Sequence, residues 1–225
     1  MINQQTEWVD GFFKIKKLNM NVIQLREITL QVNNYVKERF KDVVIYKRFG
    51  NRSTNLFAMY NTFLIATGPL YDLFKEINIF WNQVKPDNDN YYIGSWVNVY
   101  EESESIGWHH HWGDNPGTCA WHGFFCVDVD VSRTSYALDP LYYHDSKAVD
   151  YIYNGEPILK YNDEYQLVDV VGRDNFLILS PSKGDFHRNI PWSIKDRPRI
   201  TIAFDIVPGR LIDNSQWENH WIPFI

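Results

Sequence analysis

The sequence predicts a mainly β protein, a sandwich or jelly roll, with helices packed on it from the N-terminal side. Apolar residues at helical spacing occur only before residue 85, and short β-prone runs separated by turn residues follow. Aromatic residues make up 16% of the 225 residues, which is typical of β-structure with deep pockets. The length fits a single domain, 1–225, with a mixed, helical part (1–88), a β core (89–210) and a C-terminal tail (211–225).

Two helices are predicted in the N-terminal part. Apolar residues recur at steps of three and four from Val22 to Phe40, which is the spacing of one helix face. A second helix is predicted to start near Thr67, a plausible cap that is followed by a proline in the first turn, and to run to Val84. Both apolar faces are interpreted as packing surfaces.

Five runs in the second part are predicted to be strands. They are 91–100, 119–131, 166–171, 176–179 and 200–207. Turn signals lie between them, for example Asn154-Gly155. The polar, tyrosine-rich stretch 141–163 is predicted to be a long loop or hairpin over one mouth of the barrel, or a plain surface insertion.

Composition and charge argue against several classes of function. The net charge of −6 argues against broad nucleic-acid binding, which needs a basic footprint. We see no signal peptide and no apolar run of membrane-spanning length, so we expect no membrane partner. Cys119 and Cys126 lack metal-binding spacing and are expected to be reduced core residues of a cytoplasmic protein. The oligomeric state is left open.

Three consecutive histidines are the strongest chemical feature of the sequence. On an extended chain, His109 and His111 point to one face and His110 to the other, so the first and third can chelate one ion. His187, which follows a tight turn, is the best candidate for a third ligand, and imidazole suits iron, zinc, copper and nickel. The alternatives are His110 on a bulged strand, a carboxylate such as Asp114, or a surface histidine cluster without metal.

The last predicted strand carries a candidate anion anchor. Alternation places Arg199 and Thr201 on one face and Ile200 on the other, against the helices. A guanidinium and a hydroxyl two residues apart can hold a carboxylate through a bidentate pair and a third bond. The alternatives are a surface ion pair at the strand end and the competing anchor Arg197, which lies beside Pro198 in the preceding turn.

Taken in order, these residues resemble the 2-oxoglutarate/Fe(II)-dependent oxygenases, and most closely a prolyl-hydroxylase-related branch found in bacteria and phages. The resemblance covers residues 91 to about 207 and implies a double-stranded β-helix, the cupin-like form of jelly roll, over 89–210. The matching pieces are Ser95–Tyr100, Trp108–His111, Gly123–Phe125, Leu138–Pro140, Phe176–Pro181, His187 and Arg199–Phe204.

The resemblance also implies a ligand set for Fe(II). His109 falls on the first metal ligand of the family and His187 on the distal histidine. His111 stands where the wider family has Asp or Glu, so three imidazoles would leave the centre one negative charge short. Phage or bacterial origin would place the protein in the bacterial, or host, cytoplasm.

For the cosubstrate, the resemblance implies that Arg199 holds the C5 carboxylate of 2-oxoglutarate and that Thr201 assists. Asn98 and Tyr100 share a strand face with Trp96, so their polar tips either reach the cosubstrate or pack inside the barrel. Further tryptophans would exclude water from the site, or are core residues: Trp108, Trp112 and Trp121.

The implied activity is oxygenation, as a hydroxylase, of an unidentified small-molecule or peptidyl substrate. Two rival functions stay open: a cupin-like metalloenzyme that does not use 2-oxoglutarate, and a non-catalytic jelly-roll ligand-binding module. His122 is interpreted as a packed or hydrogen-bonded histidine, and Asp205 as a structural partner on the face of Arg199. His144-Asp145 lies in the predicted loop, where it either shapes substrate access or is solvated, and His220 is interpreted as incidental.

Overall fold

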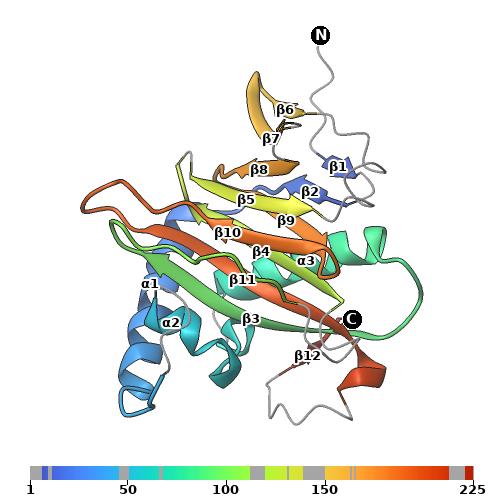
Figure 1. Cartoon of the computed structure of the whole chain (residues 1–225). Coiled ribbons are helices and arrows are strands. Elements are labelled where there is room, and N and C mark those ends of the chain that lie inside the picture. The colour runs from blue at the N-terminus through green and yellow to red at the C-terminus, as the bar shows by residue number, and fades with distance from the viewer. Residues whose placement is uncertain are drawn as a thin grey trace.

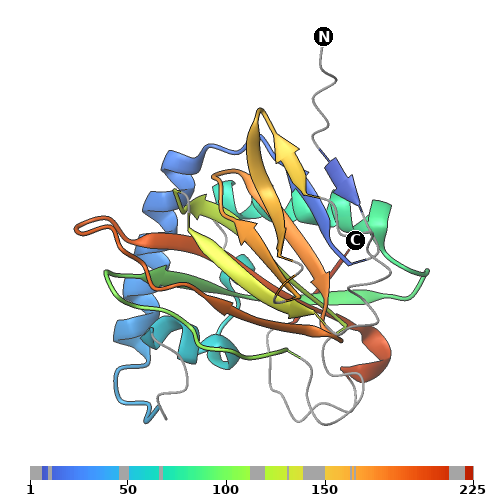
Figure 2. The same cartoon turned by 45° about the horizontal axis from the view of Figure 1, so that its top comes forward.

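Two antiparallel β-sheets face each other in the computed structural model, and helices cover the outer face of the larger sheet (Figures 1 and 2). This arrangement confirms the predicted fold class, a mainly β jelly roll with N-terminal helices packed on it. The structure describes residues 7–9, 12–45, 51–65, 68–111, 120–130, 132–138, 150–162, 164, 166–212 and 221–224.

The larger sheet is built around β11 (Arg199–Pro208), which pairs along its length with β3 (Tyr91–Tyr100) and with β4 (Trp121–Asp128). Beyond β4 lie β9, β2 and β1, and beyond β3 lies β12. The bounds of these outer strands are Phe176–Pro181 (β9), Lys14–Lys17 (β2), Glu7–Val9 (β1) and Ile222–Pro223 (β12). The sequence did not predict β1, β2 or β12, which extend the sheet with residues from both ends of the chain.

The smaller sheet has the order β10-β5-β8-β7-β6. Its strands are Asp185–Asn189 (β10), Arg133–Leu138 (β5), Leu167–Val171 (β8), Glu156–Asn162 (β7) and Tyr151–Tyr153 (β6). The described part of the tyrosine-rich stretch is the β6–β7 hairpin, which closes at Asn154-Gly155 with both residues at positive φ. Residues 139–149, with His144-Asp145, lie outside the described residues. The strands β5 and β10 were not predicted.

Both predicted helices are present, as α1 (Val22–Arg39) and α3 (Gly68–Val84). The Asn21 side chain caps α1 by accepting a hydrogen bond from the backbone N–H of Gln24. Three short helical elements lie between α1 and α3: α2 (Arg52–Asn55), η1 (Phe57–Met59) and η2 (Thr62–Leu64). A further turn, η3 (Gly209–Leu211), follows β11.

Strand alternation divides the interior into two cores. Ile200, Ile202 and Phe204 of β11 pack against the buried faces of α1 and α3, as predicted. Ala203, on the opposite face of the same strand, packs between the two sheets with residues such as Tyr136. Each fully buried large apolar side chain contributes roughly 1.5–3 kcal/mol to folding, so both faces of β11 are held firmly. The residues between the sheets are therefore placed on a rigid support.

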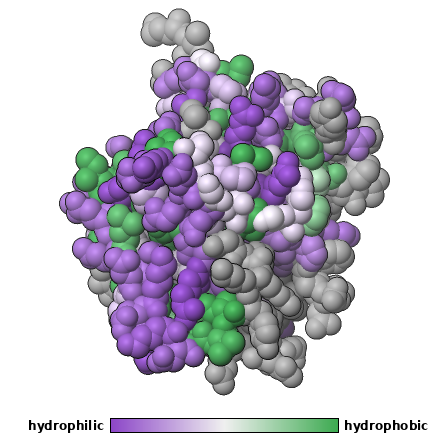
Figure 3. Space-filling model, turned by 60° about the vertical axis from the view of Figure 1, so that its left-hand side comes forward, coloured by the Kyte–Doolittle hydropathy of each residue, from purple (hydrophilic) through white to green (hydrophobic). Residues whose placement is uncertain are grey.

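The face of the molecule in Figure 3 is mostly hydrophilic, and its hydrophobic residues lie in small separate patches. Isolated patches of this kind are normal for a protein surface. In the described ranges, no helix combines the length and apolar character that crossing a bilayer requires.

Candidate metal centre and anion site

A single β-bridge brings the histidine run to the smaller sheet. His109 and His187 exchange two backbone hydrogen bonds, each 2.9 Å long. The run was expected to be extended, and it forms this one bridge rather than a full strand. His187 itself lies in β10, so its side chain is fixed by a paired strand.

Three of the histidines meet, and they are those that strand parity predicts. Ligand atoms of His109, His111 and His187 all lie within 4.8 Å of one another. The ring centroids of His109 and His187 are 4.3 Å apart, and the centroid of His111 is 5.3 Å from each of them. His110 is exposed and points toward Phe186 instead. Asp114, the carboxylate alternative, lies outside the described residues.

Each of the three imidazoles has its Nδ1 engaged by an oxygen acceptor. His109 Nδ1 lies 2.8 Å from the carbonyl oxygen of Gly107, and His111 Nδ1 lies 3.0 Å from Oδ1 of Asp205. His187 Nδ1 donates to the carboxylate of Asp185. Because these oxygens only accept, Nδ1 carries the hydrogen and Nε2 keeps its lone pair for a metal. Within the described part of the chain, the buried Nε2 of His111 has no hydrogen-bond partner, so this atom fits a metal ligand.

Asp205 anchors two histidines through one oxygen. His122 Nδ1 donates to the same Oδ1 at 3.1 Å, and the rings of His111 and His122 stack with centroids 3.7 Å apart and planes 15° from parallel. Ligand atoms of His111, His122 and Asp205 also lie within 4.8 Å of one another. However, the faces of His111 and His122 are in contact at 3.7 Å, so their ring nitrogens cannot converge on one ion, whereas the near-parallel rings of His111 and His187 are 5.3 Å apart. We therefore interpret His122 as a packed, hydrogen-bonded histidine, as the sequence predicts, and Asp205 as the anchor of both rings, a role that the sequence did not predict.

The charges of the site suit a cation. Burial, followed by the neighbouring His187 and His111, lowers the pKa of His109 to about 2, so this ring is neutral at neutral pH. Burial favours the neutral acid of Asp205, but His111 and His122 outweigh burial and hold the pKa of Asp205 below its usual range. Burial lowers the pKa of His111, yet Asp205 raises it overall, so a metal at His111 competes with a proton.

Arg199 is a buried cation with an unused donor. Its Nε donates to Ser132 Oγ at 2.9 Å, while its Nη1 is buried and has no partner among the described residues. An orphaned guanidinium donor in the barrel interior fits an anionic ligand. Burial lowers the pKa of Arg199 from its usual value. The competing anchor Arg197 is instead half-exposed, and its Nε donates to Asp128 at 2.9 Å.

The other predicted cosubstrate residues form one buried polar network beside Arg199. Asn98 donates through Nδ2 to Thr201 Oγ1 at 3.4 Å and accepts from Thr54 Oγ1 at 2.6 Å. The Tyr100 hydroxyl lies 3.3 Å from Thr54 Oγ1, and the ring of Tyr100 lies 5.9 Å from Cζ of Arg199. The structure thus brings together the residues predicted at this site and adds Thr54.

Several residues of the site were missed from the sequence. Tyr136 on β5 stacks on His187 with centroids 5.0 Å apart and interacts electrostatically with Arg199, so it lies near both parts of the candidate site. Ser132 and Asp185 contact Arg199 and His187 directly. Asp185, two residues before His187, carried a readable signal, because alternation places both on one face of a strand. Tyr136 and Ser132 carried none, since β5 was not predicted.

Of the tryptophans suggested as walls of the site, Trp96 is in place. Its ring lies 5.8 Å from that of His111 and 6.0 Å from that of His122. Trp108 lies elsewhere, stacked on the exposed Phe186, and Trp121 packs against Trp81 under the helices. The alternative of a core residue therefore holds for Trp121, and Trp108 does not line the candidate site. Trp112 lies outside the described residues.

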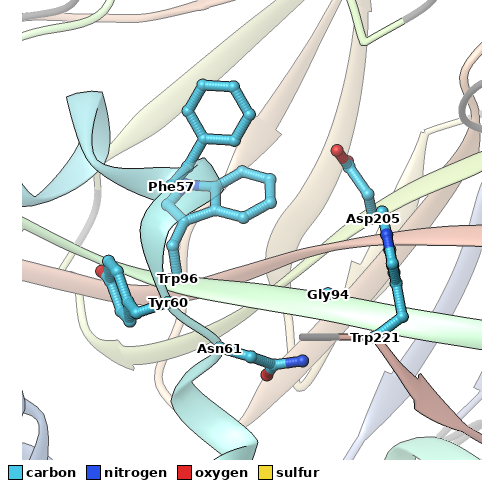
Figure 4. Close-up of a pocket in the computed structure, with 7 residues that line it drawn as sticks. All are labelled: Phe57, Tyr60, Asn61, Gly94, Trp96, Asp205 and Trp221. Carbon is cyan, nitrogen blue, oxygen red and sulfur yellow. The ribbon is translucent and has the colours of Figure 1, made fainter. Parts of the chain in front are cut away.

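A pocket of about 40 Å³ adjoins the metal centre (Figure 4). Phe57, Tyr60, Asn61 and Trp96 lie on one side of it, and Asp205 and Trp221 on the other. Gly94 forms its floor, where an added Cβ would lie 2.8 Å from the Trp221 ring.

Comparisons with known proteins give a likeness in structure only. No protein-family model matches the sequence, and no curated protein matches it. The apo structure of ThoJ, a non-heme monooxygenase, is 15% identical with a TM-score of 0.52, and the match covers 89% of this chain and 75% of ThoJ. A Pseudomonas putida prolyl-4-hydroxylase is 9% identical with a TM-score of 0.47, over 89% of this chain and 94% of that one.

A third structure, SnoN, is a non-heme alpha-ketoglutarate-dependent epimerase from nogalamycin biosynthesis. It is 14% identical with a TM-score of 0.49, and the match covers 88% of this chain and 79% of SnoN. The likeness to ThoJ shows a shared fold. The predicted bacterial and phage branch stays a prediction. The chain therefore has a jelly-roll fold like that of a non-heme oxygenase, and its activity has to be argued from the site.

Proposed function

We propose that this protein is a 2-oxoglutarate- and Fe(II)-dependent oxygenase, a hydroxylase whose prime substrate is unidentified. The observation that carries the proposal is the pairing of two unsatisfied groups inside one barrel. Among the residues that the structure describes, the buried Nε2 of His111 has no hydrogen-bond partner, and neither has the buried Nη1 of Arg199. The first suits a metal, and the second suits the far carboxylate of a dicarboxylic cosubstrate.

His109, His111 and His187 would hold Fe(II) through their Nε2 atoms. When bound, the iron supplies the coordination of the cosubstrate and the activation of dioxygen for oxidation of the substrate. The chain supplies the orientation of the ligands, because each ring is fixed through its Nδ1. Gly107 holds His109, Asp205 holds His111 and Asp185 holds His187. Asp205 also places a negative charge one imidazole away, which partly replaces the carboxylate that the family has as a direct ligand.

Arg199 would orient the cosubstrate by pairing with its C5 carboxylate. Thr201 accepts a hydrogen bond from Asn98, so its own hydroxyl hydrogen is left to donate to the same carboxylate. Asn98 acts through Thr201, and Tyr100 lines the anchor through its ring. Trp96 stacks beside His111 and would help to keep water out of the site.

Binding of 2-oxoglutarate to the metal-loaded protein tests this assignment. Calorimetry should show that Arg199→Ala weakens binding by roughly 10- to 150-fold, because a charge-assisted bond of this kind contributes about 1.5–3 kcal/mol. Arg197→Ala is the matched control, since that half-exposed arginine pairs with Asp128 and should leave the affinity unchanged.

Equal affinity of Arg199→Ala and the unchanged protein would contradict the cosubstrate assignment. That result would favour a cupin-like metalloenzyme that does not use 2-oxoglutarate, because such an enzyme has no need of a buried arginine with a free donor.

A further inference from the structure

The pocket beside the metal centre has a lining of unusual chemistry. Among the described residues that line it, four are aromatic, namely Phe57, Tyr60, Trp96 and Trp221, and Asp205 alone is charged (Figure 4). Trp96 and Asp205 also contact His111, so the pocket shares two residues with the metal centre. A group bound there would lie one imidazole ring away from the metal position.

The protein already uses the amide of Asn61 and one acceptor position of the Tyr60 hydroxyl. Asn61 Oδ1 accepts from the backbone N–H of Phe63 and from Ser95 Oγ, and Asn61 Nδ2 donates to the carbonyl of Ile93 at 3.0 Å. The hydroxyl of Tyr60 accepts from the backbone N–H of Val97 at 2.9 Å. The pocket therefore offers a ligand mainly aromatic faces and a carboxylate.

Asp205 has an oxygen to spare. His111 and His122 both donate to Oδ1, and within the described ranges no further bond uses Oδ2. A carboxylate between aromatic rings attracts a cation, because each ring face carries negative potential. The same carboxylate would repel an anion, and the net charge of −6 acts in the same direction.

We propose that this pocket binds an ammonium head group, and that the prime substrate is therefore an organic amine cation. That the bound amine is a substrate rests on the proposed oxygenase function, whereas the binding of the cation is argued from the pocket alone. Asp205 would pair with the ammonium hydrogens or lie beside an N-methylated nitrogen, and Trp96 and Trp221 would face its apolar groups.

The volume limits what enters. About 40 Å³ holds roughly three water-sized groups, since one such group needs about 10–15 Å³. A primary or N-methylated amine head fits this space. The rest of a larger substrate would lie outside this space.

The Trp221 ring packs directly against Gly94, where a side chain would clash with it. An added Cβ at Gly94 would lie 2.8 Å from Cζ3 of the Trp221 ring, and a rigid ring has to move as a whole to relieve such a contact. Gly94→Ala should therefore displace the indole and weaken the pocket without touching the metal ligands. This provides a second variant that is independent of truncating Trp221 itself.

The test compares n-butylammonium with n-butanol, which share size and shape and differ in charge. Binding to the full-length protein is measured by ligand-observed NMR without metal or 2-oxoglutarate, so that the result does not depend on the oxygenase assignment. We expect the ammonium to bind at least about tenfold more tightly than the alcohol. Equal affinity for the two, or no binding of the ammonium up to about 50 mM, would overturn the proposal.

Variants locate the site. Trp221→Leu, Gly94→Ala and Asp205→Asn should each weaken n-butylammonium binding by about tenfold or more. Trp108→Leu is the matched control, because it removes an indole that stacks on Phe186 outside the pocket, and it should change the affinity less than about twofold. If the three pocket variants bind as tightly as Trp108→Leu does, the cation lies elsewhere and the proposal fails.

Failure of the two proposals can be told apart. If only the oxygenase assignment is wrong, Arg199→Ala will bind 2-oxoglutarate as tightly as the unchanged protein does, and ammonium binding will be intact. If only the pocket assignment is wrong, the protein will not bind the ammonium but will still bind 2-oxoglutarate through Arg199.

Discussion

At the scale of single residues, the hydrogen bond that Nδ1 of each imidazole makes leaves Nε2 of the same ring free to bind a metal. His187 donates through Nδ1 to Asp185, and His111 donates to Asp205, so in both rings Nε2 keeps the lone pair that would bind the proposed metal. Such carboxylate partners orient the ring and raise its basicity. The ring of His109 is held by a backbone carbonyl instead, which gives it orientation without added charge.

Asp185→Asn tests this role of the carboxylate partners. The substitution keeps the shape of the side chain and removes its charge, so we expect metal affinity to fall by roughly 10- to 100-fold. The measurement is competitive metal titration against a chromophoric chelator. Asp169→Asn on β8 is the matched control, because that carboxylate accepts a hydrogen bond from Ser135 in the same sheet and, among the described residues, bonds no histidine. An equal affinity for Asp185→Asn and Asp169→Asn would contradict the role.

Parity along the chain made the residue-scale predictions possible. His109 and His111 share a face in the structure, and His110 does not, which follows from extended geometry alone. The anchor of His111 could not be identified in the same way, because Asp205 is 94 residues further along the chain and meets it only in the folded protein. Contacts of this kind leave no local signal.

At the scale of elements, β11 links both cores and both parts of the site. Its outward residues pack under the helices, while Arg199, Thr201 and Asp205 line the barrel interior. This strand was predicted almost to its bounds, because its alternation is strong. Strands β5 and β10 were missed, because their short polar sequences become strands only through pairing with each other and with β8.

Gly123 of β4 tests how closely the helix-side core is packed. A Cβ there would meet the Phe204 ring at 2.5 Å and Cδ2 of Leu179 at 2.6 Å, so Gly123→Ala should lower the free energy of unfolding by roughly 1–3 kcal/mol. Gly68→Ala in α3 is the control, since nothing lies within 4 Å of its added Cβ and alanine favours a helix. Denaturant unfolding checks both. A Gly123→Ala protein as stable as Gly68→Ala would contradict this packing.

At the scale of the whole molecule, the proposed metal ligands come from separate parts of the chain. His109 and His111 precede β4, whereas His187 lies in β10 of the smaller sheet. An ion bound to all three would therefore link both sheets and stabilise the folded state. The division into parts 1–88, 89–210 and 211–225 stays a prediction, as does the cytoplasmic location.

Thermal unfolding measures this link. At a metal concentration about 100 times the dissociation constant, binding adds roughly 2.7 kcal/mol, which corresponds to a rise of about 5–10 °C in Tm for a domain of this size. We expect His110→Ala to keep the rise, since that ring is exposed, and His111→Ala to lose most of it. Equal responses of the two variants, measured anaerobically with Fe(II), would mean that the metal binds elsewhere.

The central claim is that this barrel uses iron and 2-oxoglutarate together, and succinate formation tests it most directly. The purified protein is incubated in air with Fe(II), ascorbate and 2-oxoglutarate, and succinate is quantified. We predict slow, Fe(II)-dependent succinate formation that persists in His110→Ala and Arg197→Ala and is lost in His111→Ala and Arg199→Ala. Succinate formation that survives both His111→Ala and Arg199→Ala, or its absence from a protein shown to bind both iron and 2-oxoglutarate, would contradict the claim.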